Sequence, residues 1–151
     1  MTRKQEAQAA ARLQQDLVGF IRAFGLLSSD RTPCGQPMAP SDAHALTEIA
    51  DGGVSQRDLV NRLHLDRSSV SRLVERLVAR GWVSRTGDDG DRRTVRLTAT
   101  PAGQQIAADI AHSRAERFAT LLAGIPPDRR GQVLDALRLL TEAANDNGGS
   151  P

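Results

Sequence analysis

The sequence predicts a mainly α-helical fold with a small β-hairpin, and three observations support this fold class. Apolar residues recur at three- and four-residue spacing in several segments, as in amphipathic helices. Two short β-type runs in the middle of the chain flank a turn rich in Gly and Asp. Aromatic residues are scarce, while Ala, Leu and Arg are abundant. The chain has 151 residues, which is enough for one domain with a real core and hardly for two.

The N-terminal part should form a long helix followed by a loop and a short helix. The spacing of Leu13, Leu17 and Phe20 predicts the long helix over residues 5–29. Three prolines and a glycine make residues 30–40 a loop. The short helix then runs over 41–50 with Ser41 as its N-cap, and it ends where Asp51-Gly52-Gly53 breaks the pattern.

Two further helices are joined by a three-residue turn. Ser55 and Asp58 have the spacing of a capping box and open a helix over 55–63. After the turn 64–66, Asp66 is a plausible N-cap for a helix over 67–80, which Gly81 should end as the C′ residue. One side of this second helix is apolar and the other is polar; the apolar positions are Val70, Leu73, Val74, Leu77 and Val78. Two helices joined in this way form a helix-turn-helix pattern.

A hairpin and two long helices complete the chain. The β-type runs 82–85 and 94–99, joined by GDDGDRR, predict a wing, so residues 41–100 should form a winged helix-turn-helix core. Thr100 and Pro101 predict an N-cap and an N1 proline for a helix over 101–123. A last helix follows over 128–144, and the tail 145–151 is expected to be disordered. The helices over 5–29 and 101–144 have more apolar surface than a small core can cover, so we expect them to pack against a second copy.

Charge is concentrated where the recognition elements are expected. The net charge is +2, yet residues 57–96 hold ten Arg against six acidic residues, a local excess of +4. Such an excess is the electrostatic pattern of a surface that binds phosphates.

The run DRSSVSRLVERLVARGWVSR, followed by GDRRTVRLTATPAG, resembles the helix-turn-helix, wing and exit of the multiple antibiotic resistance regulator (MarR) family. The order of the helices is similar over nearly the whole chain, and the part from about 55 to 103 is the specific one. The resemblance implies a dimeric bacterial transcription regulator, here a repressor, that binds a palindromic double-stranded DNA operator and releases it on a signal. It also implies that Asp91 braces the wing while Arg93 probes a DNA groove.

Two groups of residues are candidates for DNA contacts. The N-terminal half of the helix over 67–80 should enter the major groove, where Arg suits guanine and Ser suits either a base or a phosphate. The wing should reach the minor groove, whose negative potential attracts Arg. The candidates are Arg67, Ser68, Ser69, Ser71, Arg72 and Arg76 on the helix, and Arg92 and Arg93 on the wing.

The signal that acts on the regulator is open between three alternatives. Phe20 and Phe24 lie near the place where members of the family bind small aromatic or lipophilic ligands, although such a pair is more often dimer core. Zinc could be bound if Cys34, His44 and His112 converged with carboxylates, but none of the usual metal-ligand spacings is present. The thiol of Cys34 could also act as a redox switch, if a cation such as Arg31 lay beside it.

Other classes of protein fit less well. No nucleophile elbow, phosphate-binding glycine loop or metal-hydrolase motif is present. We therefore expect that the protein is not an enzyme and binds no cofactor. A winged helix used for protein–protein contact would need an apolar outer face, and the outer face of the helix over 67–80 consists of Ser and Arg. A single Cys and the lack of a signal peptide or an apolar span indicate a cytoplasmic protein without a membrane segment.

Overall fold

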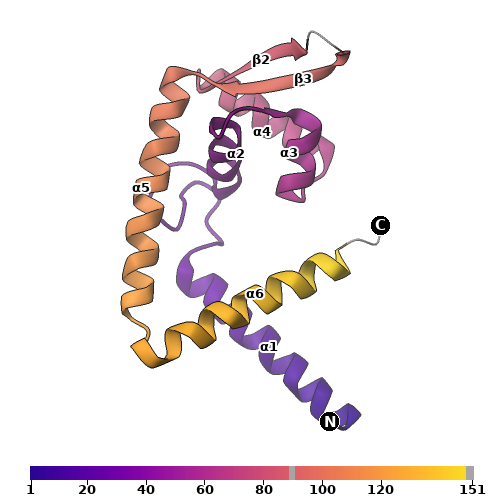
Figure 1. The fold of residues 1–151 in the computed structure, drawn as a ribbon, viewed down its shortest axis with the longest axis vertical. Helices are drawn as coiled ribbons and strands as arrows, with labels where there is room; N and C mark the ends of the chain where they lie inside the picture. The colour runs from indigo at the N-terminus through magenta and orange to yellow at the C-terminus, as the bar shows by residue number, and fades with distance from the viewer. Residues whose placement is uncertain (89–90, 149–151) are drawn as a thin grey trace. The chain divides into compact units, whose positions relative to one another are not determined.

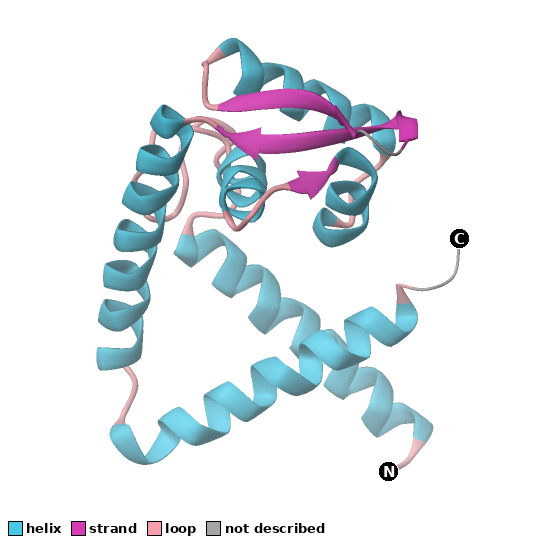
Figure 2. Ribbon diagram, turned by 45° about the horizontal axis from the view of Figure 1, so that its top comes forward, coloured by secondary structure: helices cyan, strands magenta, loops and turns pink. Residues whose placement is uncertain are grey.

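The computed structural model describes residues 1–88 and 91–148, without the side chains of residues 88 and 91–93. Figures 1 and 2 show a mainly helical chain with one small sheet, in agreement with the predicted fold class. The chain divides into two compact units, residues 1–113 and residues 114–151, and each is described by itself. The elements in order are α1 (Arg3–Phe24), α2 (Pro40–Ala50), β1 (Val54–Ser55), α3 (Gln56–Leu63), α4 (Arg67–Ala79), β2 (Val83–Asp88), β3 (Asp91–Ala99), α5 (Pro101–Ala123), the 3-10 turn η1 (Pro127–Arg129) and α6 (Arg130–Asn147).

The first two helices differ from the prediction at their ends. α1 stops at Phe24, five residues before the predicted end, because Gly25 adopts a left-handed conformation (φ 91°) and its N–H bonds back to the helix. α2 begins at Pro40 and has Ala39 as its N-cap, so the assignment of Ser41 as the cap was wrong. Proline at N1 starts this helix because it needs no amide partner there.

The helix-turn-helix is formed as the sequence predicts. The Ser55 side chain accepts a hydrogen bond from the Asp58 N–H at 3.0 Å and caps α3. Asp66 caps α4 in the same way, accepting from the Ser69 N–H at 2.8 Å. At the other end, Gly81 follows the C-cap residue as predicted, and its N–H donates to the carbonyl of Val78.

The sheet has three strands, one more than predicted. Its order is β1-β3-β2 and both pairs are antiparallel. β1 has only two residues, Val54 and Ser55, which pair with Leu97 and Arg96 of β3. A strand of two residues leaves too short an alternation to detect in a sequence. Both hairpin strands also extend further toward the tip than the predicted runs.

The core lies between the helix-turn-helix, α2 and the sheet. Val70, Leu73, Val74 and Leu77 of α4 are almost completely buried, which confirms the predicted apolar stripe. They pack in one cluster with residues of α2, α3, the sheet and α5; these include Leu46, Ile49, Leu59, Leu97 and Ile110. The cluster holds the polar face of α4 toward the outside.

The long helices leave much apolar surface uncovered. On α1, Leu13, Leu17 and Phe20 are exposed. In the second unit, α6 begins after η1 and continues to Asn147, three residues beyond the predicted end, so the first part of the predicted tail is helical. The exposed apolar residues of the second unit are Phe118, Leu121, Leu122, Leu134, Leu137 and Leu139. None of the helices in the described ranges has the length and apolar character of a membrane span.

Candidate nucleic-acid interface

The outer face of α4 carries arginine and serine side chains that are free to contact a ligand. Arg67, Ser68 and Arg72 are exposed, while Ser69 and Ser71 are half-buried. Across residues 1–88 and 91–148, neither Arg67 nor Arg72 forms an ion pair. Because α4 buries its opposite face in the core, these side chains are presented on a rigid helix.

The start of α4 is tied together by the carboxylate of Asp66. The Ser68 hydroxyl donates to Oδ1 at 2.6 Å, and the Ser69 hydroxyl donates to Oδ2 at 2.7 Å. The Ser69 N–H donates to Oδ1 as well. The hydrogen bonds from Ser68 and then from Ser69 lower the pKa of Asp66 well below its ordinary value. The carboxylate is therefore ionised at neutral pH and can only accept.

Arg76 has a structural role that the sequence did not reveal. Its Nη2 and Nε donate to the two carboxylate oxygens of Asp42 at 2.6 and 3.1 Å. The Asp42 side chain is 2% exposed and that of Arg76 is 48% exposed. This hydrogen bonding raises the pKa of Arg76, while burial opposes the shift. In the described part of the chain Nη1 has no acceptor, so one edge of the guanidinium can still meet a phosphate.

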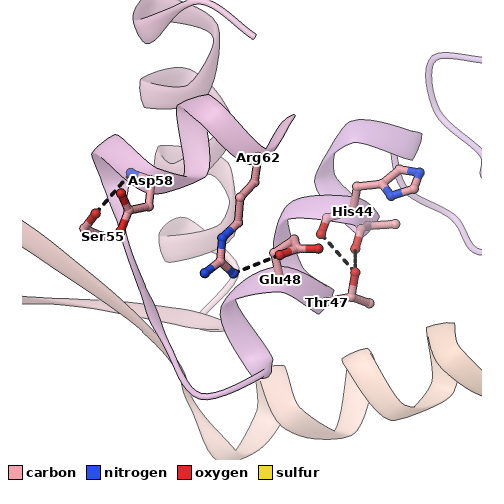
Figure 3. Close-up of polar contacts among 7 residues, drawn as sticks. His44, Thr47, Glu48, Ser55, Asp58 and Arg62 are labelled. Atoms are coloured by element: carbon pink, nitrogen blue, oxygen red, sulfur yellow. Dashed lines mark hydrogen bonds and ion pairs between the residues drawn. The ribbon is translucent and has the colours of Figure 1, made fainter. Parts of the chain in front are cut away.

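A second ion pair joins the first helix of the helix-turn-helix to α2. Arg62 Nη1 of α3 lies 3.0 Å from Glu48 Oε2 of α2, and both side chains are about half exposed. Figure 3 shows this pair and the Ser55 cap at the other end of α3. Together with the Asp42–Arg76 pair, it fixes both helices of the motif to the same support.

The described side-chain contacts of the wing lie at its base. The side chains of Arg92 and Arg93, which the sequence predicts to contact a groove, lie outside the described residues, and so does that of Asp91, the predicted brace of the wing. At the base, Arg96 Nη2 donates to the carbonyl of Gly52 at 3.1 Å. Arg85 on β2 is exposed and is not among the residues that the sequence pattern predicts to contact DNA. It is a further cation on the same strand pair.

The junction between α4, the wing and α5 is closely packed. Thr100 Oγ1 donates to the carbonyl of Gly81 at 2.6 Å, and the Thr100 N–H donates to the carbonyl of Trp82 at 3.0 Å. Thr100 also caps α5, as predicted, by accepting from the Gly103 N–H at 3.1 Å. The Arg80 guanidinium lies 4.8 Å from the centre of the Trp82 ring. The end of α4 and the start of α5 are therefore joined through backbone contacts.

The two candidate effector residues on α1 contact each other. The rings of Phe20 and Phe24 are stacked with centroids 5.4 Å apart. Phe24 is buried, whereas Phe20 is 42% exposed. Neither phenylalanine lines the open hollow of about 360 Å³ near the loop before α2. The residues that line it are Ser29, Asp30, Pro37, Met38, Ala39, Asp42, Arg76 and Arg80.

The structure does not bring the metal candidates together. Within the part of the chain that is described, no group of three or more His, Cys, Asp and Glu side chains is arranged to hold a metal ion. Cys34, His44 and His112 therefore do not form the zinc site considered as an alternative. In Figure 3 the His44 ring points away from Glu48. Cys34 is a half-exposed free thiol in the loop before α2.

The helices α3 and α4 are joined by a short turn, α4 is amphipathic, and a hairpin anchored on the core follows. These features define a winged helix-turn-helix protein. Residues 36–94, which hold this motif, match the model of the MarR family. A curated relative, the exopolysaccharide II synthesis transcriptional activator ExpG of Rhizobium meliloti (strain 1021), is 26% identical over 125 residues. The match covers 79% of this chain and 64% of the relative, so the chain spans less than two thirds of that protein.

Solved structures agree over almost the whole chain. The PcaV transcriptional regulator from Streptomyces coelicolor is 25% identical, with a TM-score of 0.66 over 93% of this chain and 98% of that one. Streptococcus pneumoniae FabT, solved in complex with DNA, is 16% identical, with a TM-score of 0.67 over 95% of this chain and 96% of that one. The helix-turn-helix and wing of this chain therefore match the MarR family model, and the chain has the fold of these solved transcription regulators.

Proposed function

We propose that this protein is a sequence-specific DNA-binding repressor that acts as a homodimer on a palindromic operator. The observation that carries the proposal is the outer face of α4, where Arg67 and Arg72 stand unpaired in the described structure beside short polar side chains. Arginine on a major-groove helix reads guanine, and small neighbours allow close approach to the base edges. FabT, whose structure includes DNA, supports the same use of this fold.

Arg72 should carry sequence readout. We expect Arg72→Ala to relax the preference at one base pair of each half-site by roughly 1–3 kcal/mol, because a bidentate contact to guanine is lost. Selection from random duplex DNA followed by titration of single-base variants measures this. Arg31→Ala, which removes another exposed arginine from the loop before α2, is the control and should change neither affinity nor preference.

The wing should act differently. Because Arg93 is predicted to lie in the minor groove, Arg93→Ala should weaken operator binding. It should change base preference mainly at flanking A·T-rich positions, where groove width is read. If Arg72→Ala and Arg93→Ala both left affinity and preference unaltered, the assignment of the two DNA readers would be wrong.

The dimer should form through the long helices. We expect a C2 dimer at micromolar concentration because the exposed apolar residues of α1 and α6, such as Leu17 and Leu137, need cover that a monomer lacks. Sedimentation equilibrium measures the mass. A stable monomer would contradict the proposal, and Leu137→Glu should shift a true dimer toward monomer while the helix-turn-helix core stays folded.

Release from the operator is assigned to a small aromatic or lipophilic ligand, rather than to zinc. The half-exposed ring of Phe20, stacked on buried Phe24, offers such a ligand an aromatic surface. A ligand that prefers one dimer shape changes the separation of the recognition helices, which two half-sites require to be about 34–36 Å. Phenolic compounds that neither raise thermal stability nor release DNA would exclude this signal.

A further inference from the structure

The hydroxyl groups at the start of α4 have a defined hydrogen-bond polarity. A serine hydroxyl has one hydrogen to donate and two lone pairs with which to accept. Ser68 and Ser69 each place their single hydrogen on the carboxylate of Asp66, at 2.6 and 2.7 Å. An ionised carboxylate has no hydrogen of its own, so the direction of both bonds is fixed. Toward the surrounding solvent, the two hydroxyls present lone pairs only.

We infer that Asp66 is a positioning residue for sequence readout. By accepting the hydroxyl hydrogens of Ser68 and Ser69, it makes both hydroxyls acceptors, which select adenine or cytosine in the major groove. The inference rests on the proposed function, that α4 reads DNA. In that groove only adenine N6 and cytosine N4 offer hydrogens; guanine O6 and N7 and thymine O4 are acceptors. Phosphate oxygens are acceptors too, so the same geometry directs both serines away from the backbone.

Asp66 is ionised at neutral pH. Its pKa is lowered in the folded protein, so the charged form is retained at all pH values above the ordinary range of aspartate. The same carboxylate also holds the Ser69 N–H at 2.8 Å, which ties the polarity of the hydroxyls to the helix cap itself.

Asp66→Asn tests the inference with a change of almost no volume. Asn caps helices as well as Asp does, so the amide oxygen should still accept from the Ser69 N–H and from the Ser68 hydroxyl. The amide nitrogen then replaces Oδ2 and donates to Ser69, whose hydroxyl hydrogen is released toward the DNA. At the base that Ser69 contacts, preference should move from adenine or cytosine to guanine or thymine. The expected change is roughly two- to tenfold, the size of one neutral hydrogen bond.

The experiment is a selection from random duplex DNA with the full-length protein and four variants: Asp66→Asn, Ser69→Ala, the double variant Asp66→Asn/Ser69→Ala, and Asp58→Asn. Asp58→Asn makes the same chemical change at the start of α3, where the backbone N–H rather than a serine hydroxyl bonds to the cap, and it controls for the loss of one negative charge. Thermal unfolding shows whether each variant is folded.

We expect Asp66→Asn to change the selected base at one position, and Asp58→Asn to change none. In the Ser69→Ala background, Asp66→Asn should have no further effect on base preference. The inference is overturned if Asp66→Asn selects the wild-type sequence, or if its change persists without Ser69, which would mean that residue 66 contacts DNA directly. If the wild-type protein selected no sequence at all, the proposed function itself would fail.

Discussion

Gly103→Ala should strongly destabilise the protein, although it introduces the best helix former into a helix. A Cβ at this position would lie 2.8 Å from the carbonyl carbon of Trp82 and closer still to its oxygen. These atoms belong to the backbone and cannot rotate away. Relief would require the start of α5 to move away from Trp82, the residue before β2, which would break the hydrogen bond from the Thr100 N–H to the Trp82 carbonyl. We expect a loss of unfolding free energy on the order of 3 kcal/mol, measured by urea denaturation.

Gly19→Ala is the matched control for this prediction. Gly19 lies inside α1, and a Cβ there would meet nothing within 4 Å. By helix propensity alone the variant should be neutral or more stable by up to about 1 kcal/mol. The two substitutions are chemically identical, so opposite signs isolate the contact with Trp82. Equal or higher stability of Gly103→Ala would contradict the close packing of this junction.

Arg76→Met should produce the second large loss, about 2–4 kcal/mol of unfolding free energy. It leaves the carboxylate of Asp42 buried without its two hydrogen bonds, and an unpaired buried charge is costly. The expected loss of unfolding free energy is smaller than for a fully buried ion pair, because the Arg76 side chain is half exposed and partly screened by water. Denaturant titration at neutral pH measures it.

Two further variants show whether the unpaired charge is the cause. Arg62→Met breaks the exposed pair with Glu48 and should cost less than about 1 kcal/mol. The double variant Asp42→Leu/Arg76→Met removes both charges together and should recover much of the lost stability. If Arg76→Met cost no more than Arg62→Met, Asp42 would not depend on its partner as described.

The main helices could be predicted because their signals are local. The cap at Asp66, the apolar stripe of α4 and the Thr100-Pro101 start of α5 each lie within a few neighbouring residues, and the structure has all three. The end of α1 could not be placed in this way. Apolar spacing continues past Gly25, and only the left-handed backbone at that residue stops the helix.

Features that depend on distant parts of the chain were missed. The pair between Asp42 and Arg76 joins residues 34 positions apart, and nothing in either segment marks the aspartate as buried. Strand β1 forms only because Val54 and Ser55 meet β3 about forty residues later. For the candidate interface, residue types indicated which side chains face outward, but not that Asp66 orients two of the serines.

The pairing of β1 with β3 has a consequence for how the protein folds. The middle strand, β3, pairs with β1, which precedes α3 in the chain, and with β2, which follows α4. We therefore expect the wing to be complete only after both helices have docked. We therefore expect the hairpin not to fold independently of the motif. Wing and helix-turn-helix should unfold in one cooperative transition, and a hairpin excised or transplanted without β1 should remain unstructured in water.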